Sequence, residues 1–216
     1  MLKRYFTIQG YGETEIEINR SRFICYVERV ESEEEAHSFI ASIKKKHWDA
    51  THNCSAYIIG EHDQIQKADD DGEPSGTAGK PILEVLKKNH VKDTAVVVTR
   101  YFGGIKLGAG GLIRAYGKGA SEALKAGKIV ERVLHDLYQF EIDYTFLGKI
   151  ENELRSKPEF IIDHIGYLDM VTVSVLVESG QESSLITWMT DLTSGQVKVS
   201  QGESRYIEFD KEVQDT

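Results

Sequence analysis

The chain has 216 residues, of which 40% are hydrophobic and 9% aromatic, and its formal net charge is −9. Such a chain buries roughly 70–75% of its unfolded surface, as one domain or two small ones. No export signal is visible, and no apolar run approaches the ~20 residues that a membrane-spanning helix needs. Cys25 and Cys54 lack metal-ligand spacing and lie in strand-like segments. These features predict buried, reduced thiols in a cytoplasmic protein.

The first part of the chain alternates strand and helix patterns. Ser32, with Glu35 three residues later, forms a capping box that predicts the start of a helix. Lys44–Lys46 is expected to be the solvated end of that helix rather than a contact surface. The expected strands are Tyr5–Gln9, Glu15–Ile18, Phe23–Val30, Cys54–Ile59, Ile65–Ala68, the buried Thr94–Tyr101 and Ile129–Val133, and two further helices end near Asn89 and span Gly110–Ala126. This order predicts an α/β sandwich.

The hydrophobic pattern indicates a domain boundary near residue 135. The elements expected beyond it are the strand Leu137–Asp143, the helix Phe146–Ser156, the strands Glu159–His164 and Met170–Glu178, a helix carrying Leu185 and Leu192, and a last strand Gln196–Phe209. The order βαββαβ is typical of the ferredoxin-like fold. The expected fold class is therefore α+β, with an N-terminal α/β sandwich over residues 1–135 and a ferredoxin-like domain over residues 136–216.

Charge is distributed unevenly between these two parts. Lys and Arg number 20 against 19 Asp and Glu in residues 1–135, but 6 against 16 in residues 136–216. Within the first part, Pro74–Arg132 has 11 cations and 4 anions, a local excess of +7. The asymmetry predicts two domains with different surfaces or partners.

The stretch Arg100–Gly119, RYFGGIKLGAGGLIRAYGKG, contains seven glycines. Glycine weakens a helix or strand by about 0.5–1 kcal/mol relative to alanine, so this stretch must need backbone freedom. It completes no dinucleotide-binding fingerprint because Ile113 takes the last glycine position, and SGTAGKP is no P-loop because Pro81 follows the lysine. Two interpretations stay open for Gly108, Gly110 and Gly111: an anion-contacting loop at a helix N-terminus, or close backbone packing.

A basic stripe is predicted on the helix that follows these glycines. Its apolar face consists of Leu112, Tyr116, Ala120, Ala123 and Leu124. Arg114, Lys118 and Lys125 therefore share the opposite face, and Arg100 and Lys106 are expected to extend the stripe towards the helix start. The alternative is that these cations are merely solvated. Tyr101 and Phe102 are expected to pack in the core. The alternative is that their rings are exposed and stack on bases.

The acidic segment DDDGEPSGTAGKP, Asp69 to Pro81, is interpreted as structural. Its carboxylates lack a His or Cys in ligand register and the alternate spacing of an EF-hand, so no metal site is expected. The Asp-Gly pair predicts a turn, and Ser75 or Thr77 is expected to cap the helix that follows. Cys54 near His52 has no placed third group, and no catalytic residue is assigned.

Four segments resemble the IMPACT/YigZ family: SRFICYV, DATHNCSAY, DDGEPSGTAGKPIL and VVVTRYFGGIKLGAGGLIRAYG. The resemblance covers Ser21–Tyr116 by motif and the C-terminal half by architecture. It implies an N-terminal domain like the second domain of a small-subunit ribosomal protein family, followed by a ferredoxin-like domain. Similar domains recur at the end of elongation factor G. Eukaryotic relatives regulate translation initiation through protein contacts, using a partner-binding module that is not expected in this chain.

The sequence therefore predicts a non-enzymatic, translation-associated protein that contacts RNA, the ribosome or a translation factor, without a cofactor, a metal or a membrane. The expected contact residues are Arg100, Lys106, Gly108, Gly110, Gly111, Arg114 and Lys118. A second hypothesis is a nucleotide-dependent small-molecule phosphotransferase that uses the glycine-rich loop. A third is a protein-binding adaptor that makes no RNA contact.

Overall fold

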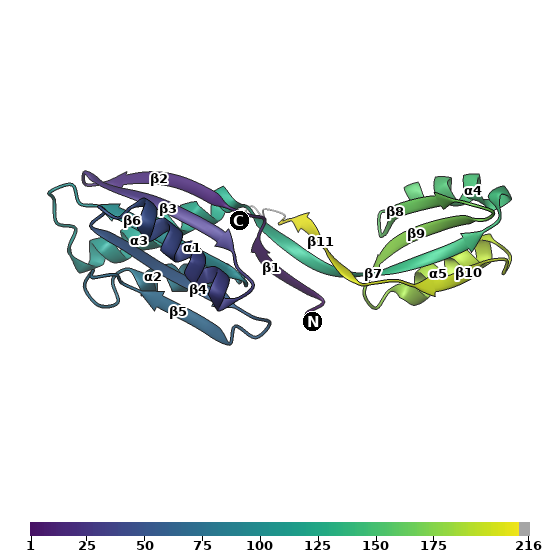
Figure 1. The fold of residues 1–216 in the computed structure, drawn as a ribbon, viewed down its shortest axis with the longest axis horizontal. Helices are drawn as coiled ribbons and strands as arrows, with labels where there is room; N and C mark the ends of the chain where they lie inside the picture. Colours follow the sequence, from purple (N-terminus) through teal and green to yellow (C-terminus); the bar gives the residue numbers. More distant parts are fainter. Residues whose placement is uncertain (212–216) are drawn as a thin grey trace. The chain divides into compact units, whose positions relative to one another are not determined.

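The computed structural model describes residues 1–211, which form two sheets and five helices in a mixed α/β architecture (Figure 1). The chain divides into two compact units. Within the described residues, unit 1 contains Met1–Glu131 and 208–211, and unit 2 contains Arg132–Ile207. No helix among the described residues is long and apolar enough to cross a membrane.

Unit 1 is built around a five-stranded antiparallel sheet in the order β2-β3-β6-β4-β5. Helix α1 covers one face of this sheet, and α2 and α3 lie side by side on the other (Figure 1). The elements are β1 (Arg4–Ile8), β2 (Gly12–Ile18), β3 (Ser21–Arg29), α1 (Glu33–Lys46), β4 (His52–Ile59), β5 (Ile65–Asp69), α2 (Gly79–Lys88), β6 (Thr94–Tyr101) and α3 (Gly108–Gly127).

Helices on both faces explain why seven of the eight residues of the central strand β6 are buried. Side chains alternate between the two faces of a strand, so a strand covered on both sides has no solvent-facing row. Val96 and Val98 pack in the core beneath α2 and α3, and Val97 packs beneath α1. Ser32 caps α1 as predicted, its Oγ accepting the Glu35 N–H at 3.2 Å. Both cysteines are free and buried, as predicted.

Unit 2 has the ferredoxin-like arrangement that the element order predicts. Its sheet runs β10-β7-β9-β8 with antiparallel neighbours, and α4 and α5 pack on one face. Val173 and Val175 of β9 face these helices together with Phe140, which is fully buried. The elements are β7 (Ile129–Ile142), α4 (Tyr144–Arg155), β8 (Phe160–Tyr167), β9 (Val171–Glu178), α5 (Glu182–Leu192), β10 (Lys198–Gln201) and β11 (Arg205–Asp210).

Strand β7 differs from the sequence prediction. The sequence indicated two strands with a domain boundary near residue 135, whereas the structure has one strand of 14 residues. The polar pair His135 and Asp136 broke the predicted pattern, yet both are buried. Asp136 accepts a hydrogen bond from Ser204 Oγ at 2.5 Å, which satisfies its carboxylate. The chain passes from unit 1 to unit 2 inside this strand, after Glu131, and the last predicted strand is divided into β10 and β11.

Candidate nucleic-acid interface

One end of the five-stranded sheet brings together most of the residues that the sequence singled out. Strand β6 runs antiparallel to β3 and β4, and its end pairs with their beginnings: Arg100 lies opposite Phe23 and His52, and Tyr101 lies opposite Arg22. The segments that lead into α2 and α3 follow β5 and β6 at this same end, because both strands finish there. The acidic segment and the glycine-rich loop are therefore neighbours in the fold.

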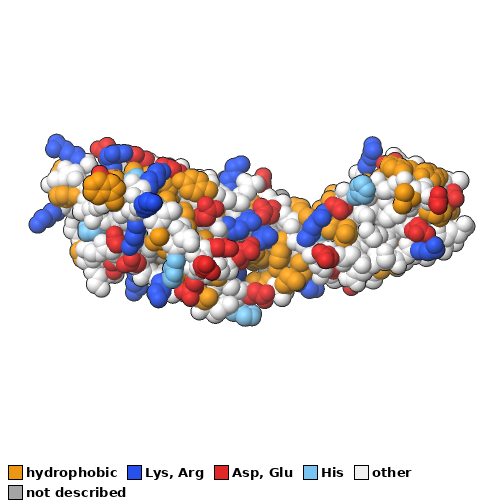
Figure 2. Space-filling view, viewed as in Figure 1, with side chains coloured by type: hydrophobic (Ala, Val, Ile, Leu, Met, Phe, Trp, Pro, Cys, Tyr) orange, Lys and Arg blue, Asp and Glu red, His pale blue; other side chains and the backbone are white. Residues whose placement is uncertain are grey.

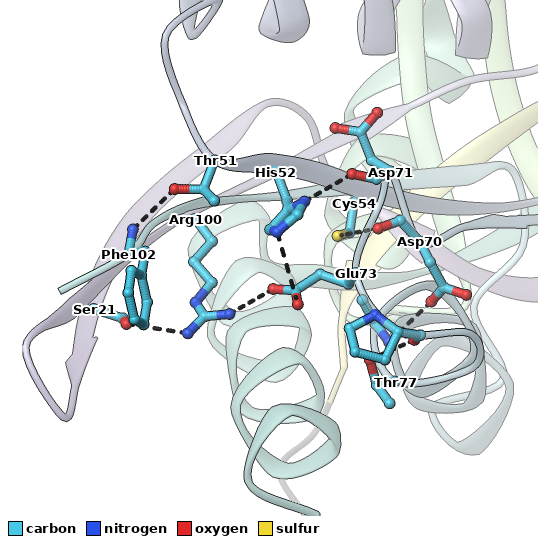
Figure 3. Close-up of polar contacts among 12 residues, drawn as sticks. Ser21, Thr51, His52, Cys54, Asp70, Asp71, Glu73, Thr77, Arg100 and Phe102 are labelled. Atoms are coloured by element: carbon cyan, nitrogen blue, oxygen red, sulfur yellow. Dashed lines mark hydrogen bonds and ion pairs between the residues drawn. The ribbon is translucent and has the colours of Figure 1, made fainter. Parts of the chain in front are cut away.

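A buried polar network lies behind this end of the sheet, centred on Glu73 (Figure 3). The Glu73 carboxylate accepts hydrogen bonds from Arg100 Nη1 at 2.7 Å and from the Tyr116 hydroxyl at 2.8 Å. His52 Nε2 lies 3.8 Å from the other carboxylate oxygen. Burial raises the pKa of the Tyr116 hydroxyl, so it remains a donor to this carboxylate. The network joins the acidic segment to β4, β6 and α3.

Arg100 is therefore not part of an exposed basic stripe, which corrects the sequence prediction. Only 5% of its surface is accessible, and its charge is paired with Glu73. Its Nη2 donates to Ser21 Oγ at 3.3 Å, and the same hydroxyl accepts the Gly103 N–H at 3.3 Å. The Phe102 N–H donates to Thr51 Oγ1 at 3.0 Å. Arg100 thus helps to fix the base of the glycine-rich loop from within the buried network.

Cys54 is a structural thiol. Its Sγ donates to the Asp70 carbonyl at 3.1 Å, and burial raises its pKa, so the nucleophilic thiolate is suppressed. His52 is committed elsewhere, with Nδ1 2.8 Å from the Asp71 carbonyl oxygen. Among residues 1–211 no three His, Cys, Asp or Glu side chains are grouped so as to hold a metal ion.

The acidic segment is organised by Asp70, which caps α2 from outside the helix (Figure 3). Its carboxylate accepts the N–H groups of Gly76, Ala78 and Gly79 at 2.7, 3.0 and 2.8 Å. The predicted cap residue Thr77 instead donates its hydroxyl to the Pro74 carbonyl at 2.6 Å. The sequence correctly predicted that a side chain caps α2, but it assigned the cap to Ser75 or Thr77. The capping side chain comes instead from Asp70, in the preceding turn.

The end of α1 is also tied to this segment. Lys44 Nζ lies 2.7 Å from Asp71 Oδ1 and 3.2 Å from Asp69 Oδ2. Lys46 pairs with Glu13 at 3.2 Å. The prediction that the three lysines form a solvated end therefore fails for Lys44, which is half-buried between two carboxylates, whereas Lys45 and Lys46 are exposed. Of these three lysines, Lys45 alone has no ion pair within residues 1–211.

Asp70→Asn is expected to lower the free energy of unfolding by about 1–2 kcal/mol at pH 7, the scale of a lost helix cap. Burial opposes ionisation of Asp70, but its three backbone donors outweigh burial and hold the pKa below its usual value. A lowered folded-state pKa contributes stability above the ordinary Asp pKa and loses it as pH falls through the folded value. The difference should therefore shrink below about pH 4. Urea unfolding at pH 7 and pH 3 measures it, and equal losses at both would contradict this role.

Gly108 and Gly110, at the start of α3, are exposed to solvent, whereas Gly111 is half-buried and a Cβ added there would lie 3.0 Å from Leu107 Cβ. Helix α3 begins at Gly108, so the predicted loop Gly108–Gly111 is its first turn, and no side chain caps it. A Cβ added at Gly108 would meet nothing within 4 Å, and one at Gly110 would meet only Arg114 Nη1 at 3.6 Å. Close packing therefore does not explain these two glycines. Gly108 has φ +69°, which glycine adopts readily, but no such strain accounts for Gly110.

The basic stripe on α3 has the predicted helical geometry. The apolar residues from Leu112 to Leu124 on one face are buried in the core, and Arg114 and Lys118 are exposed. Lys106, in the segment before the helix, is exposed as well. Within residues 1–211 these three cations have no ion pair, whereas Lys125 pairs with Glu122 at 2.8 Å. Figure 2 shows Lys and Arg side chains at this end of unit 1.

We define the glycine-loop surface by the six remaining residues: Lys106, Gly108, Gly110, Gly111, Arg114 and Lys118. Phe102, 45% exposed, borders it and lies 5.4 Å from the Arg100 guanidinium. Ile105 and Ile113 are exposed beside it. The Tyr101 ring is partly buried against the core, with the Arg22 guanidinium 5.7 Å from its centroid and the His47 ring 5.8 Å away, so it is less open to stacking than Phe102. The sequence prediction that Phe102 packs in the core is therefore wrong.

Comparison with known protein families gives two matches along the chain. Residues 19–124 match the Impact N-terminal domain, and residues 140–196 match a domain of unknown function, DUF1949. The "IMPACT family member YvyE" of Bacillus subtilis is 58% identical over 208 residues, covering 96% of this chain and 95% of that protein. The "IMPACT family member YigZ" of Escherichia coli is 35% identical, covering 85% and 90%.

More distant and structural relatives agree with this picture. "Protein IMPACT" of Mus musculus is 38% identical over 94 residues, which is 41% of this chain and 29% of that protein. A solved structure described as "Crystal structure of an hypothetical protein" is 31% identical, with a TM-score of 0.60, and covers 94% of this chain and 99% of that one.

Proposed function

Because the chain belongs to the IMPACT family, we propose that it is a non-enzymatic, translation-associated protein that binds RNA through the glycine-loop surface. Translation is the process that the family resemblance implies. RNA is the partner that the chemistry of this surface supports, since phosphate contacts dominate nucleic-acid affinity and are made by exposed, unpaired cations.

The observation that carries the proposal is the position of Arg114. Its Nη1 would lie 3.6 Å from a Cβ at Gly110, so the guanidinium folds back over the first turn of α3. The N–H groups of that turn have no acceptor within the helix, and the helix dipole adds a partial positive charge there. A phosphate in this position would meet a guanidinium and backbone donors together, and the missing side chains at Gly108 and Gly110 would let it approach.

The exposed ring of Phe102 supports single-stranded RNA over a duplex. Unpaired bases stack on exposed aromatic rings, and such stacking contributes about 1–3 kcal/mol per base. Lys118 lies one turn beyond Arg114 on the same helix face, so the cations continue in a row that an extended backbone can follow.

The test is a charge-matched pair of variants. Arg114→Gln with Lys118→Gln removes two proposed phosphate contacts. Lys45→Gln with Lys88→Gln removes the same charge from two exposed lysines outside the glycine-loop surface, which have no ion pair within residues 1–211. Each phosphate contact to a single strand adds roughly 0.7 to the slope of log affinity against log salt. The Arg114→Gln/Lys118→Gln variant should therefore have a slope smaller by about 1.4 than that of the unmodified chain. Labelled oligouridylate and purified bacterial ribosomes are titrated across a salt series, with circular dichroism to verify folding.

Three outcomes would count against the proposal. Equal losses in both double variants would show that only diffuse charge matters. No binding by the unmodified chain at low salt would remove RNA as a partner. Ribosome association that survives nuclease treatment and both double variants would instead favour a protein-binding adaptor.

A further inference from the structure

Unit 2 carries a second unusual surface, at the tip of the β8–β9 hairpin. Four large hydrophobic side chains are exposed there: Tyr144, Tyr167, Leu168 and Met170, which we call the hairpin-tip surface. Leu168 is 82% exposed. None of the four belongs to the core of unit 2. Figure 2 shows hydrophobic side chains gathered over unit 2 near α4. A cluster of this kind is rare on a soluble protein unless it binds something.

The hairpin-tip surface is held in a fixed shape. Tyr167 pairs with Val171 at the end of the hairpin, and the Leu168 N–H donates to the Met170 carbonyl at 3.1 Å. The Tyr144 hydroxyl, at the start of α4, donates to the Leu168 carbonyl at 2.6 Å. The side chains are thus presented by a turn that is tied to a helix, which reduces the entropy lost on binding.

Charge at the same tip is negative. Asp169 lies in the turn between Leu168 and Met170, and Asp143 precedes Tyr144. Neither carboxylate has an ion pair within residues 1–211, although Asp143 accepts the Thr145 N–H as the cap of α4. Unit 2 as a whole contains 6 Lys and Arg against 12 Asp and Glu, a net charge of −6.

We propose that the hairpin-tip surface binds a partner protein that offers an apolar slot bordered by Lys and Arg. Exposed Leu, Tyr and Met side chains are suited to fill such a slot, and Asp143 and Asp169 are suited to its basic rim. The carboxylates disfavour RNA and anionic lipid, and they would repel each other if two tips met. This inference is independent of the proposed RNA contact, because it rests on residues of unit 2 alone.

The probe is a library of random 12-residue peptides displayed on phage and selected on the immobilised full chain. Enriched peptides are expected to contain a large apolar residue flanked by Lys or Arg. Synthetic copies of these peptides should bind the double variant Leu168→Ser/Tyr167→Ser at least about tenfold more weakly than the unmodified chain, as expected for loss of an anchor side chain. Asp169→Asn should weaken binding less and reduce its salt dependence. Trp48→Ser, which removes an 83% exposed hydrophobic residue of unit 1, should leave binding unchanged.

Other results would overturn the inference. Enrichment of no peptides, of acidic peptides, or of peptides that bind the Leu168 variant equally well would each contradict it. Self-association of the chain in sedimentation velocity that Leu168→Ser abolishes would identify a second copy as the occupant. Binding to phosphatidylglycerol vesicles that the same variant abolishes would identify a lipid surface. Circular dichroism of each variant verifies that the fold is retained.

Discussion

Glu73→Ala is expected to lower the free energy of unfolding of unit 1 by about 3–5 kcal/mol, among the largest effects of any single substitution in the chain. The variant leaves Arg100 buried without its counterion and removes the acceptor of the Tyr116 hydroxyl. A buried charge without a partner costs more than the pair itself contributes, because neither water nor a carboxylate solvates it.

Two further variants separate the charge from the hydrogen bonds. Glu73→Gln keeps an acceptor for Arg100 and Tyr116 and should cost less than Glu73→Ala. Arg100→Met in combination with Glu73→Gln removes the stranded charge and should recover part of the loss. Urea unfolding followed by circular dichroism measures all three. If Glu73→Ala unfolds at the same urea concentration as the unmodified chain, Arg100 has found water or another partner and the network is not structural.

Val173→Asp should unfold unit 2 and leave unit 1 folded. Val173 is fully buried among the side chains of α4, α5 and the neighbouring strands, and a carboxylate there has no partner. The expected loss is several kcal/mol, enough to exceed the stability of a unit of this size. Val199→Asp, at an exposed position of β10, is the matched control and should change stability little.

Tryptophan fluorescence reports this experiment directly. Trp188 packs against Phe160 in unit 2, with ring centroids 5.5 Å apart, and its emission should be red-shifted in Val173→Asp before any denaturant is added. The remaining circular dichroism should then be lost at the urea concentration at which unit 1 unfolds in the unmodified chain. Loss of both units in one transition, in variant and unmodified chain alike, would show that the units do not fold independently.

Local patterns in the sequence were enough to predict most elements of the fold. The buried face of α3 and the ferredoxin-like order of unit 2 follow from spacing alone, because helical and strand periods are properties of short segments. Strand β7 was divided in the prediction because His135 and Asp136 interrupt its alternation, and a buried polar residue is recognisable only when its partner is known. Ser204, the partner of Asp136, is 68 residues away.

The same reason explains the errors at the candidate site. Arg100 lies beside a glycine-rich loop in a basic segment, so composition indicated an exposed contact residue. Its actual environment depends on Glu73, 27 residues earlier, and on Ser21, 79 residues earlier. A cation that is buried and one that is exposed look identical in a sequence until the acid that pairs with it is located. Arg114 and Lys118 could be placed correctly because only the helix period decides which face they occupy.

The two buried thiols of unit 1 become reactive only when its core opens, so they report that opening. Cys25 and Cys54 are the only cysteines of the chain, and they lie in the same core on β3 and β4, the two strands that flank β6. A thiol reagent reaches neither while the core is closed. The rate of alkylation in native buffer therefore equals the opening rate when alkylation is faster than reclosing, and it is proportional to the population of the open state when alkylation is slower. Unit 2 has no thiol and stays invisible to the reagent. Alkylation followed by mass spectrometry thus measures the opening of unit 1 alone, and it does so without any substitution.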